Sequence, residues 1–391
     1  MLDEDTKKVL EGFENEGKRK SPPDGFPAFP VIPGGRYTDP DFQELEKESL
    51  WNKTWLYACH LDEIPEVGSY ILWNKLRVPI LIIRSGENNV KAFYNTCRHR
   101  GGPVVTEEKG KSKLLVCSYH GWSYDLEGNL VNLRDPRDFV GLDKSCQSLV
   151  KVSCEKLGNW IFVNLDPDAE PLIDYLGCIV DHMEQFQPEN LRHVHSKSYE
   201  VKCNIKVLLD AFLEVYHVQS IHQKTVNRFI DYEGTYISLW PNGHSRMVTP
   251  HRDPNWVDPG TVGLDEIETV TEIPRYHNAS YNFYPNLVTP ASATGIPFLT
   301  FWPIEKISPL SIDIALQRRN VQNKYVKIKS NSKTIDFSVL DSNKKLINKH
   351  WSASLYDVGD GVASIKLHSV LKPELNPIDG SMMEVFAKSI D

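Results

Sequence analysis

Two short cysteine–histidine pairs are the residues of this sequence best suited to chemistry. Cys97 and His99 form the first pair and Cys117 and His120 the second, with seventeen residues between His99 and Cys117. Two thiolates and two imidazoles can hold a two-iron, two-sulfide cluster, with both sulfurs on one iron and both rings on the other. Zinc accepts the same four ligands. The spacing alone therefore leaves two interpretations, an iron–sulfur cluster and a zinc site.

The residues around the pairs favour the cluster. The first segment reads Cys97-Arg98-His99-Arg100-Gly101-Gly102, and the second reads Cys117-Ser118-Tyr119-His120-Gly121-Trp122. Zinc knuckles seldom carry Gly-Gly after one pair and Gly-Trp after the other. Both segments resemble those of Rieske iron–sulfur proteins, which implies one [2Fe-2S] cluster per chain. Imidazole ligands raise the reduction potential of such a cluster above that of an all-thiolate one, so we expect it to accept electrons from a low-potential donor and pass them on.

A second constellation follows about a hundred residues later, where Glu214, His217 and His222 read E-x2-H-x4-H. If the segment is helical, Asp210, Glu214 and His217 lie at i, i+4 and i+7 on one stripe. Charge on a buried face is costly unless it is paired or bound to a metal. His222 can reach the same ion as His217 only if the helix ends or bulges between the two. Two unrelated surface histidines are the alternative interpretation, and the nearby Rieske motif favours a metal site.

Together the two motifs resemble those of Rieske non-haem iron oxygenases, terminal oxygenase α subunits, over nearly the whole chain. The resemblance implies that His217 and His222 belong to a 2-His-1-carboxylate triad on Fe(II). The third ligand would be a distant aspartate. We predict Asp360, which follows Tyr356 by four positions, with Asp357 as the alternative.

The acid before the two histidines departs from the family pattern. In relatives this acid, most often Asp, does not bind iron but bridges an iron-bound His to a Rieske His of the neighbouring subunit. The resemblance therefore implies that Glu214 orients His217 or His222 and links the two metal sites. A Glu at this position is found in relatives that act on trimethylammonium substrates such as carnitine. Asp210 stands where relatives often carry Asn, so we expect different hydrogen bonding or charge beside the iron.

Composition and charge narrow the class of protein further. The chain has 391 residues, 40% hydrophobic and 25% charged, which is typical of a soluble globular protein with room for two domains. The net charge of −8 argues against a nucleic-acid partner. Residues 1–20 lack the apolar core of a signal peptide, and no apolar run is long enough to cross a membrane. The seven cysteines lack disulfide-like spacing, which predicts a cytoplasmic location.

The elements that must position these residues indicate an α+β protein. We predict an N-terminal arm and helix at 1–55 that pack with the catalytic domain, a domain of short strands at 56–166, and a mononuclear iron domain at 167–391. The family implies an all-β Rieske domain followed by a helix-grip domain, in which an antiparallel sheet wraps a long helix. The polar stretch 320–349 is interpreted as a surface excursion. Several apolar residues, most of them aromatic, could line a substrate cavity or simply form core: Phe212, Leu213, Tyr281, Phe283, Tyr284, Phe298 and Trp302.

The implied activity is that of an oxygenase in a multicomponent system. The chain has no G-x-G-x-x-G fingerprint for a nicotinamide cofactor, so electrons would come from a separate NAD(P)H-dependent reductase, with or without a ferredoxin. Dioxygen and a small organic substrate would react at the iron by monohydroxylation, dihydroxylation or oxidative demethylation. The family implies a homotrimer (α3), and the presence of small β subunits (α3β3) stays open. The alternative is a Rieske electron carrier or ligand-binding protein without oxygenase turnover. The substrate itself is not indicated.

Overall fold

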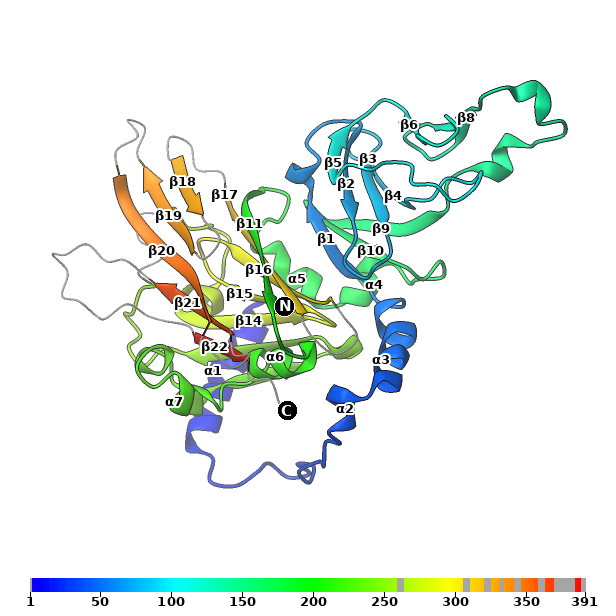
Figure 1. The fold of residues 1–391 in the computed structure, drawn as a ribbon. Helices are drawn as coiled ribbons and strands as arrows, with labels where there is room; N and C mark the ends of the chain where they lie inside the picture. Colours follow the sequence, from blue (N-terminus) through cyan, green and yellow to red (C-terminus); the bar gives the residue numbers. More distant parts are fainter. Residues whose placement is uncertain are drawn as a thin grey trace. The chain divides into compact units, whose positions relative to one another are not determined.

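The computed structural model describes residues 2–258, 264–304, 310–319, 325–330, 334–340, 346–357, 363–368 and 384–387. For residue 195, residues 310–312 and residues from 314 onward, only the course of the backbone is described. The chain forms two compact units (Figure 1). One comprises residues 44–177, and the other joins residues 1–43 to residues 178–391.

The unit of residues 44–177 is built on a seven-stranded antiparallel sheet with the order β1-β10-β9-β4-β3-β2-β5. Its strands are β1 (Leu56–His60), β2 (Ser69–Trp73), β3 (Ile80–Arg84), β4 (Val90–Tyr94), β5 (Lys109–Lys111), β9 (Lys151–Leu157) and β10 (Trp160–Asn164). The central strand β3 is buried from Ile80 to Ile83, because both of its faces are covered. This sheet is the frame from which the loops after β4 and β5 extend.

A second, smaller sheet carries the cysteine–histidine segments. It consists of β6 (Leu115–Val116), β7 (Ser123–Tyr124) and β8 (Leu130–Asn132), paired antiparallel in that order. The turn between β6 and β7 contains the second cysteine–histidine pair, and the first pair lies between β4 and β5. One buried cluster joins Phe93 of the large sheet to Leu115, Trp122 and both cysteines. The two pairs therefore share one core.

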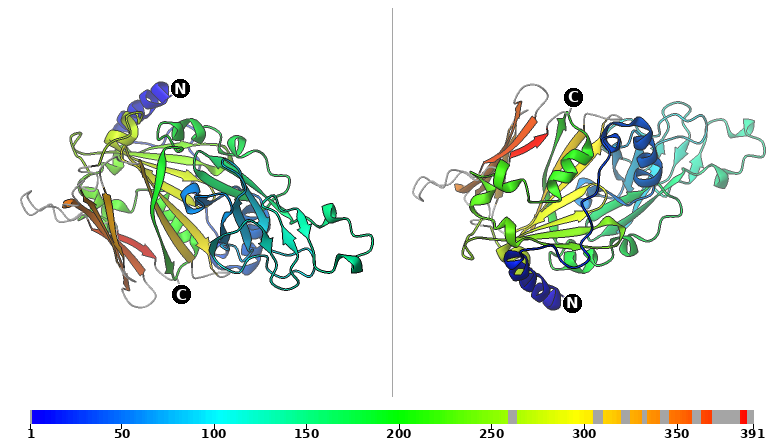
Figure 2. Two further views of the ribbon diagram at one scale, coloured as in Figure 1. Left: turned by 90° about the horizontal axis from the view of Figure 1, so that it is seen from above. Right: turned by 90° about the horizontal axis from the view of Figure 1, so that it is seen from below.

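The other unit contains a seven-stranded antiparallel sheet with the order β11-β17-β16-β15-β14-β13-β12. Its strands are β11 (Leu191–Val201), β12 (Tyr236–Leu239), β13 (Ser245–Pro250), β14 (His277–Phe283), β15 (Leu287–Ala291), β16 (Ile296–Pro303) and β17 (Leu310–Arg319). The helices of this unit are α1 (Leu2–Lys18), α2 (Gly35–Thr38), α5 (Ile179–Glu184), α6 (Ile205–Phe212), α7 (Val218–Ile221) and α8 (Glu272–Tyr276). Helix α4 (Leu172–Leu176) belongs to the unit of residues 44–177, and α3 (Pro40–Glu46) crosses the boundary between the units. Figure 2 shows α6 lying against one face of this sheet.

The two faces of this sheet separate the aromatic residues. Phe301 of β16 contacts Phe212 of α6 at 5.2 Å between ring centroids. Side chains three positions apart on a strand point to opposite faces, so Phe298, which contacts Phe283, faces away from α6. Tyr281 lies on that same opposite face with Phe283 because the two are two positions apart on β14. Phe212 therefore lies on the side of the metal-binding motif. Phe298, Phe283 and Tyr281 lie on the opposite face of the sheet and form core.

A five-stranded antiparallel sheet completes the described chain, with the order β18-β19-β20-β21-β22. Its strands are β18 (Tyr325–Ser330), β19 (Thr334–Leu340), β20 (Leu346–Asp357), β21 (Ala363–His368) and β22 (Glu384–Ala387). The stretch 320–349, for which a surface excursion was expected, therefore contains β18, β19 and the start of β20. Its Lys, Asn and Ser residues alternate with Val, Ile and Phe, which is the pattern of a strand with one polar face.

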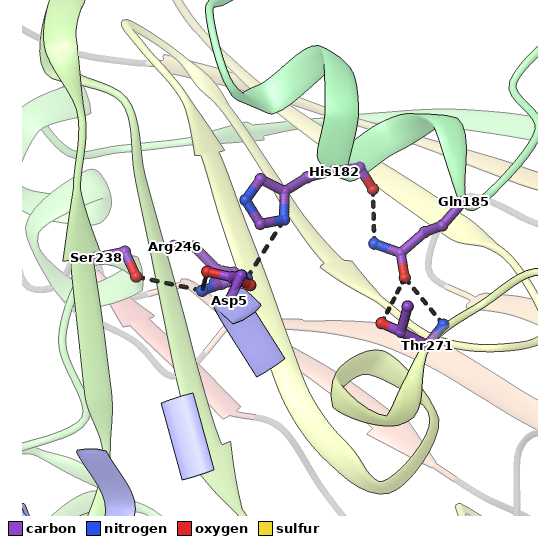
Figure 3. A network of polar contacts seen from close by, with 6 residues as sticks. All are labelled: Asp5, His182, Gln185, Ser238, Arg246 and Thr271. Carbon is purple, nitrogen blue, oxygen red and sulfur yellow. Dashed lines mark hydrogen bonds and ion pairs between the residues drawn. The ribbon is translucent and has the colours of Figure 1, made fainter. Parts of the chain in front are cut away.

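The N-terminal helix α1 is fastened to the sheet by a buried ion pair (Figure 3). The guanidinium of Arg246, only 1% exposed, donates to both carboxylate oxygens of Asp5 at 2.6 and 2.9 Å. It also donates to Nδ1 of His182 at 3.3 Å, which fixes that ring as a neutral acceptor. Burial lowers the pKa of His182 to about 4, with Arg246 acting in the same direction. The helix thus supplies the counter-charge for an arginine in the sheet.

Helix α1 also packs closely on the sheet edge. A Cβ at Gly12 would lie 2.3 Å from the ring of Tyr236, so only glycine permits this approach. Helix α1 is followed by residues 26–33, which form neither helix nor strand. In the described parts of the chain, no helix combines the length and the apolar character that a membrane crossing requires.

Candidate metal centres

The two cysteine–histidine loops adopt the same turn. In each, the cysteine N–H donates to the carbonyl five residues later, at 2.8 Å from Cys97 and 2.9 Å from Cys117. The cysteine carbonyl accepts from the N–H four residues later, at 3.0 and 2.9 Å respectively. The residues at that position, Gly101 and Gly121, have φ of 74° and 72°, a region that side chains with a Cβ rarely adopt. This explains why each pair is followed by glycine.

The four candidate ligand side chains gather between the loops. The cysteine side chains of Cys97 and Cys117 are buried, and the rings of His99 and His120 lie with their centroids 4.6 Å apart. Trp122 stacks on His99 at 4.9 Å with an interplanar angle of 7°. The loops therefore present two sulfurs and two imidazoles from one region of a shared core.

This donor set fits a two-iron cluster. Such a cluster needs two protein ligands on each iron, because bridging sulfides supply the rest. Nδ1 of His99 is buried and has no hydrogen-bond partner within the described residues, as expected of a nitrogen that awaits a metal. Burial raises the pKa of the Cys97 thiol, so cluster binding must displace a proton from it.

Tyr124 is a residue of this site that the sequence analysis did not single out. Its hydroxyl lies 3.2 Å from Sγ of Cys97 and accepts a hydrogen bond from the N–H of Arg98 at 3.0 Å. Because that N–H can only donate, the hydroxyl hydrogen is left for the sulfur. Burial raises the pKa of Tyr124, which keeps the hydroxyl protonated. Its place seven residues after Cys117, directly beyond the motif, is the signal that could have found it.

The backbone of the second motif is a helix that ends and then resumes for one turn. Helix α6 ends at Phe212, and α7 (Val218–Ile221) follows with His217 immediately before it and His222 immediately after it. The two rings meet with their centroids 5.0 Å apart and their planes at 71°. The break in the helix therefore lies before His217 rather than between the two histidines, and the two rings meet from the two ends of the single turn α7.

Glu214 holds one of these rings. Its carboxylate is bonded to Nδ1 of His217 and accepts the backbone N–H groups of His217, at 3.1 Å, and Tyr216. Burial would raise the pKa of Glu214, but the hydrogen bond and charge of His217 outweigh it and the pKa is lowered. A carboxylate on Nδ1 leaves Nε2 of His217 for a metal and fixes the direction of the ring.

The surroundings of the His222 ring differ from those of the His217 ring. Its side chain is buried, and its Nδ1 has no hydrogen-bond partner within the described residues. Burial lowers the pKa of His222 to about 4, with His217 contributing in the same direction. A neutral imidazole is the form that binds metals, so the two rings could hold a divalent iron together.

Asp210 does not share a helical stripe with Glu214 and His217. That prediction is wrong, because Leu213 closes α6 by donating to the carbonyl of Leu209 at 3.1 Å. The Asp210 side chain is exposed and accepts a hydrogen bond from the Tyr37 hydroxyl at 2.7 Å. This bond raises the pKa of Tyr37. The Tyr37 contact joins residues 173 positions apart, so local sequence gave no sign of it.

The third iron ligand cannot be placed among the described side chains. Asp360 lies outside the described residues, and Asp357 ends β20, where the backbone alone is described. Within the described side chains, no third ligand joins His217 and His222 at one metal ion. The histidine pair and Glu214 are thus the described part of this site.

Two family models match the chain in the order of its two centres. Residues 54–147 match the Rieske [2Fe-2S] domain, and residues 188–312 match the ring hydroxylating alpha subunit (catalytic domain). The chain therefore carries a Rieske domain and a ring hydroxylating catalytic domain, and the relatives that it matches are Rieske oxygenase alpha subunits. The Rieske domain of this family binds a [2Fe-2S] cluster, and its catalytic domain binds a mononuclear iron.

Relatives of known name agree with this combination of domains. The chain is 30% identical over 206 residues to the glycine betaine monooxygenase oxygenase subunit of Chromohalobacter salexigens, covering 52% of this chain and 46% of that one. It is 30% identical to the carnitine monooxygenase oxygenase subunit of Escherichia coli (51% and 55% covered). The large subunit of anthranilate 1,2-dioxygenase from Acinetobacter baylyi is 27% identical (74% and 60% covered). The chain thus spans about half the length of the first two relatives.

Solved structures share the fold. The quaternary ammonium Rieske monooxygenase CntA in complex with L-carnitine superposes with a TM-score of 0.62 at 21% identity, covering 75% of this chain and 76% of that chain. Naphthalene 1,2-dioxygenase from Rhodococcus sp. gives 0.65 at 22% identity, covering 80% and 77%. The expected fold class, a Rieske domain followed by a domain of helices and antiparallel sheet, is confirmed.

Proposed function

We propose that this chain is the terminal oxygenase component of a multicomponent Rieske system. The observation that carries the proposal is the pairing of two centres in one chain, the twin cysteine–histidine loops and the His217–His222 pair with its carboxylate. When bound, the cluster supplies single electrons and the mononuclear iron supplies dioxygen activation. The substrate would be hydroxylated or oxidatively demethylated.

Each residue has a role in this proposal. Cys97, Cys117 and the two Rieske histidines hold the cluster. His217 and His222 hold the iron together with Asp360, and Asp357 is the alternative third ligand. Glu214 keeps Nδ1 of His217 occupied, so that Nε2 faces the metal.

We propose a homotrimer as the working unit, with electrons delivered by a separate NAD(P)H-dependent reductase, with or without a ferredoxin. Relatives of this family use such partners and form multimers, and inter-subunit electron transfer is reported for a quaternary ammonium Rieske monooxygenase of similar fold. Whether small β subunits are added stays open. We also propose a cytoplasmic location, which the seven free cysteines support.

Quaternary ammonium compounds are the first substrates to test. The glutamate at position 214 is the variant associated with trimethylammonium substrates, and both the glycine betaine and the carnitine monooxygenase subunits are relatives. The substrate panel should also contain aromatic acids, because the anthranilate dioxygenase subunit aligns over more of this chain. Depletion of each compound, measured with a surrogate reductase and NADH, identifies the class.

Metal analysis tests the oxygenase function itself. An oxygenase should contain about three irons per chain, two in the cluster and one mononuclear, whereas an electron carrier contains about two. His217→Ala should lower the content to about two irons and abolish turnover, while the visible spectrum of the cluster persists. A wild-type protein with two irons and no dioxygen consumption would favour the carrier.

Substitution of the two aspartates identifies the third iron ligand. Asp360→Ala should lose the mononuclear iron and Asp357→Ala should keep it; the reverse result identifies Asp357 as the ligand.

A further inference from the structure

Helix α6 leads directly into the iron-binding segment, and it is short. It has eight residues, from Ile205 to Phe212, and Glu214 follows two positions after its end. A helix of this length is unstable by itself in water, so contacts with the rest of the fold must hold it. Ile205 and Leu208 are buried, and Phe212 contacts Phe301 of the sheet. The sheet thus holds one side of the helix, and the exposed polar side needs a partner of its own.

Tyr37 contacts this helix at both of its ends. The Tyr37 hydroxyl donates to the Asp210 carboxylate, in the last turn of α6, at 2.7 Å. The Tyr37 main-chain carbonyl accepts a hydrogen bond from the side-chain N–H of Asn204 at 2.7 Å. Asn204 is the N-cap of α6, because its side-chain oxygen accepts the N–H of Lys206 at 2.9 Å. One residue from a distant part of the chain therefore spans the helix from its cap to its last turn.

Tyr37 is itself held by the segment in which it lies. It belongs to α2, where its N–H donates to the carbonyl of Gly34 at 3.0 Å. Five residues further on, the ring of Phe42 lies 5.5 Å from the ammonium of Lys206, which is a cation–π contact with α6. The segment therefore contacts α6 at its cap, at Lys206 and in its last turn. The Tyr37 hydroxyl thus reaches the helix from a fixed position.

A short and continuous connection joins Asp210 to the proposed iron ligands. Leu213 closes the last turn by donating its N–H to the carbonyl of Leu209 at 3.1 Å. Glu214 comes next in the chain, and its carboxylate is bonded to Nδ1 of His217. A displacement of the last turn must therefore displace Glu214. Metal ligands need to be held within about 0.5 Å of the binding geometry, so even a small displacement matters.

An aspartate at position 210 suits the contact with Tyr37. A carboxylate only accepts hydrogen bonds, and a charged acceptor forms a stronger bond with a hydroxyl than a neutral amide does. The Asp210 side chain is exposed, and in the described part of the chain it does not join a group of metal-binding side chains. Its partner is Tyr37. This contact gives a reason for an acid at a position where relatives often carry Asn.

We propose that Tyr37 is a positioning residue for the mononuclear iron site. Through Asp210 it keeps the last turn of α6 formed, and the formed turn places Glu214 where it holds Nδ1 of His217. Without the hydroxyl, this turn would fray in part of the molecules, and only the remaining fraction could bind metal at full affinity. The proposal rests on the iron site of the proposed function and adds to it a residue from the N-terminal part of the chain.

Metal titration of the full-length protein tests this role without turnover. A chelator empties the mononuclear site while the cluster stays bound, and Co²⁺ is then added under anaerobic conditions. Tyr37→Phe keeps the ring and removes the hydroxyl. It should raise the dissociation constant for Co²⁺ about three- to fivefold, the factor expected from one hydrogen bond. Tyr276→Phe, which removes the hydroxyl of an exposed tyrosine in α8, is the matched control and should bind Co²⁺ like the wild type.

The other outcomes separate the positioning role from the iron site. Equal dissociation constants for Tyr37→Phe and the wild type overturn the role of Tyr37 while the iron site stands. The same holds if only the melting temperature of the variant falls, because a purely structural contact changes stability and leaves metal affinity unaltered. A wild-type protein whose Co²⁺ absorption spectrum equals that of His217→Ala overturns the iron site itself.

A double-mutant cycle tests whether Tyr37 acts through Asp210. Asp210→Ala should weaken Co²⁺ binding about as much as Tyr37→Phe, and the double variant should bind no more weakly than either, because both changes remove the same hydrogen bond. Asp210→Asn keeps an acceptor for the hydroxyl and should retain most of the affinity. Losses that add up in the double variant would show that the two residues act independently, which contradicts the proposal.

Discussion

Single hydrogen bonds decide which atoms of the candidate ligands are available. Nδ1 of His217 is occupied by Glu214, so Nε2 is the atom left for iron, and a carboxylate in this position also increases the basicity of the ring. On the cluster side, the Tyr124 hydroxyl donates to the sulfur of Cys97. A donor to a ligand sulfur stabilises negative charge on the cluster, and the reduced cluster carries one more negative charge than the oxidised one.

Removal of the Tyr124 hydroxyl should therefore make the cluster harder to reduce. Tyr124→Phe keeps the buried ring and loses one hydrogen bond worth about 1 kcal/mol, which for a one-electron couple lowers the midpoint potential by on the order of 50 mV. Spectroelectrochemical titration measures the change. Tyr119→Phe, a tyrosine in the same loop whose ring is exposed, is the control and should leave the potential nearly unchanged. Equal potentials for Tyr124→Phe and the wild type would show that this bond does not tune the cluster.

At the scale of elements, the two ligand loops are copies of one turn. Both close through the same pair of backbone hydrogen bonds, and both need a left-handed residue four positions after the cysteine. The twin turns bring residues from two separate connections to the same core. The geometry of the cluster thus depends on backbone conformation as much as on the ligand side chains.

Gly121→Ala tests this dependence on the backbone. A Cβ at Gly121 would meet no atom within 4 Å, so its only cost is the left-handed conformation, about 1–2 kcal/mol. We expect the variant to lose the cluster at a lower temperature than the wild type. The visible absorption of the cluster measures this loss. Gly17→Ala also meets no atom within 4 Å but lies in α1 without a positive φ, and it should not change this temperature. Identical transitions in both variants would argue against strain in the turn.

The anchor of α1 is a second element that depends on one interaction. Asp5→Asn leaves the buried guanidinium of Arg246 without a counter-charge, a loss of about 2 kcal/mol for a partly exposed acid. Amide hydrogen exchange in α1 should then become roughly 30-fold faster. Asp3→Asn, two residues away and exposed, is the control. Unchanged protection of α1 in Asp5→Asn would mean that packing at Gly12 alone holds the helix.

At the scale of the whole molecule, the two metal centres belong to different compact units. The candidate cluster ligands all lie in residues 44–177, and the histidine pair lies in the other unit. In the proposed oxygenase, electrons would pass from a cluster in one kind of unit to an iron in the other. In the proposed trimer, Glu214 has a second role beyond orienting His217, because it would contact the Rieske histidine of a neighbour.

Glu214→Gln should separate electron transfer from metal binding. The substitution keeps the size of the side chain and removes its charge, so both metals and the trimer should persist, while electron transfer to the iron slows by about 10- to 100-fold. Single-turnover absorbance of the cluster measures this rate. Glu200→Gln, which removes an exposed carboxylate of β11, should transfer electrons at the wild-type rate. An unaltered rate in Glu214→Gln would rule out a bridging role.

The sequence by itself determined the chemistry of the two centres, because the residues of each motif are close in the chain. Three patterns are local: the cysteine–histidine pairs, the glycines that follow them and the E-x2-H-x4-H spacing. Their ligand types and spacing can be interpreted from the local backbone geometry alone. The predicted strands around the Rieske loops followed from alternation of apolar residues for the same reason. The family and the order of its domains followed from these motifs.

The tertiary structure decided the features that join distant residues. Tyr37 meets Asp210, and Asp5 meets Arg246, contacts that no local pattern encodes because each depends on how separate elements pack. The same holds for the end of α6 at Phe212, which removed the predicted stripe, and for the choice of His217 as the partner of Glu214. The strands within 320–349 were missed because their polar face resembles a loop when the neighbouring strands are unknown. Motifs of neighbouring residues can be read from the sequence, whereas side-chain burial and contacts between distant residues depend on the whole fold.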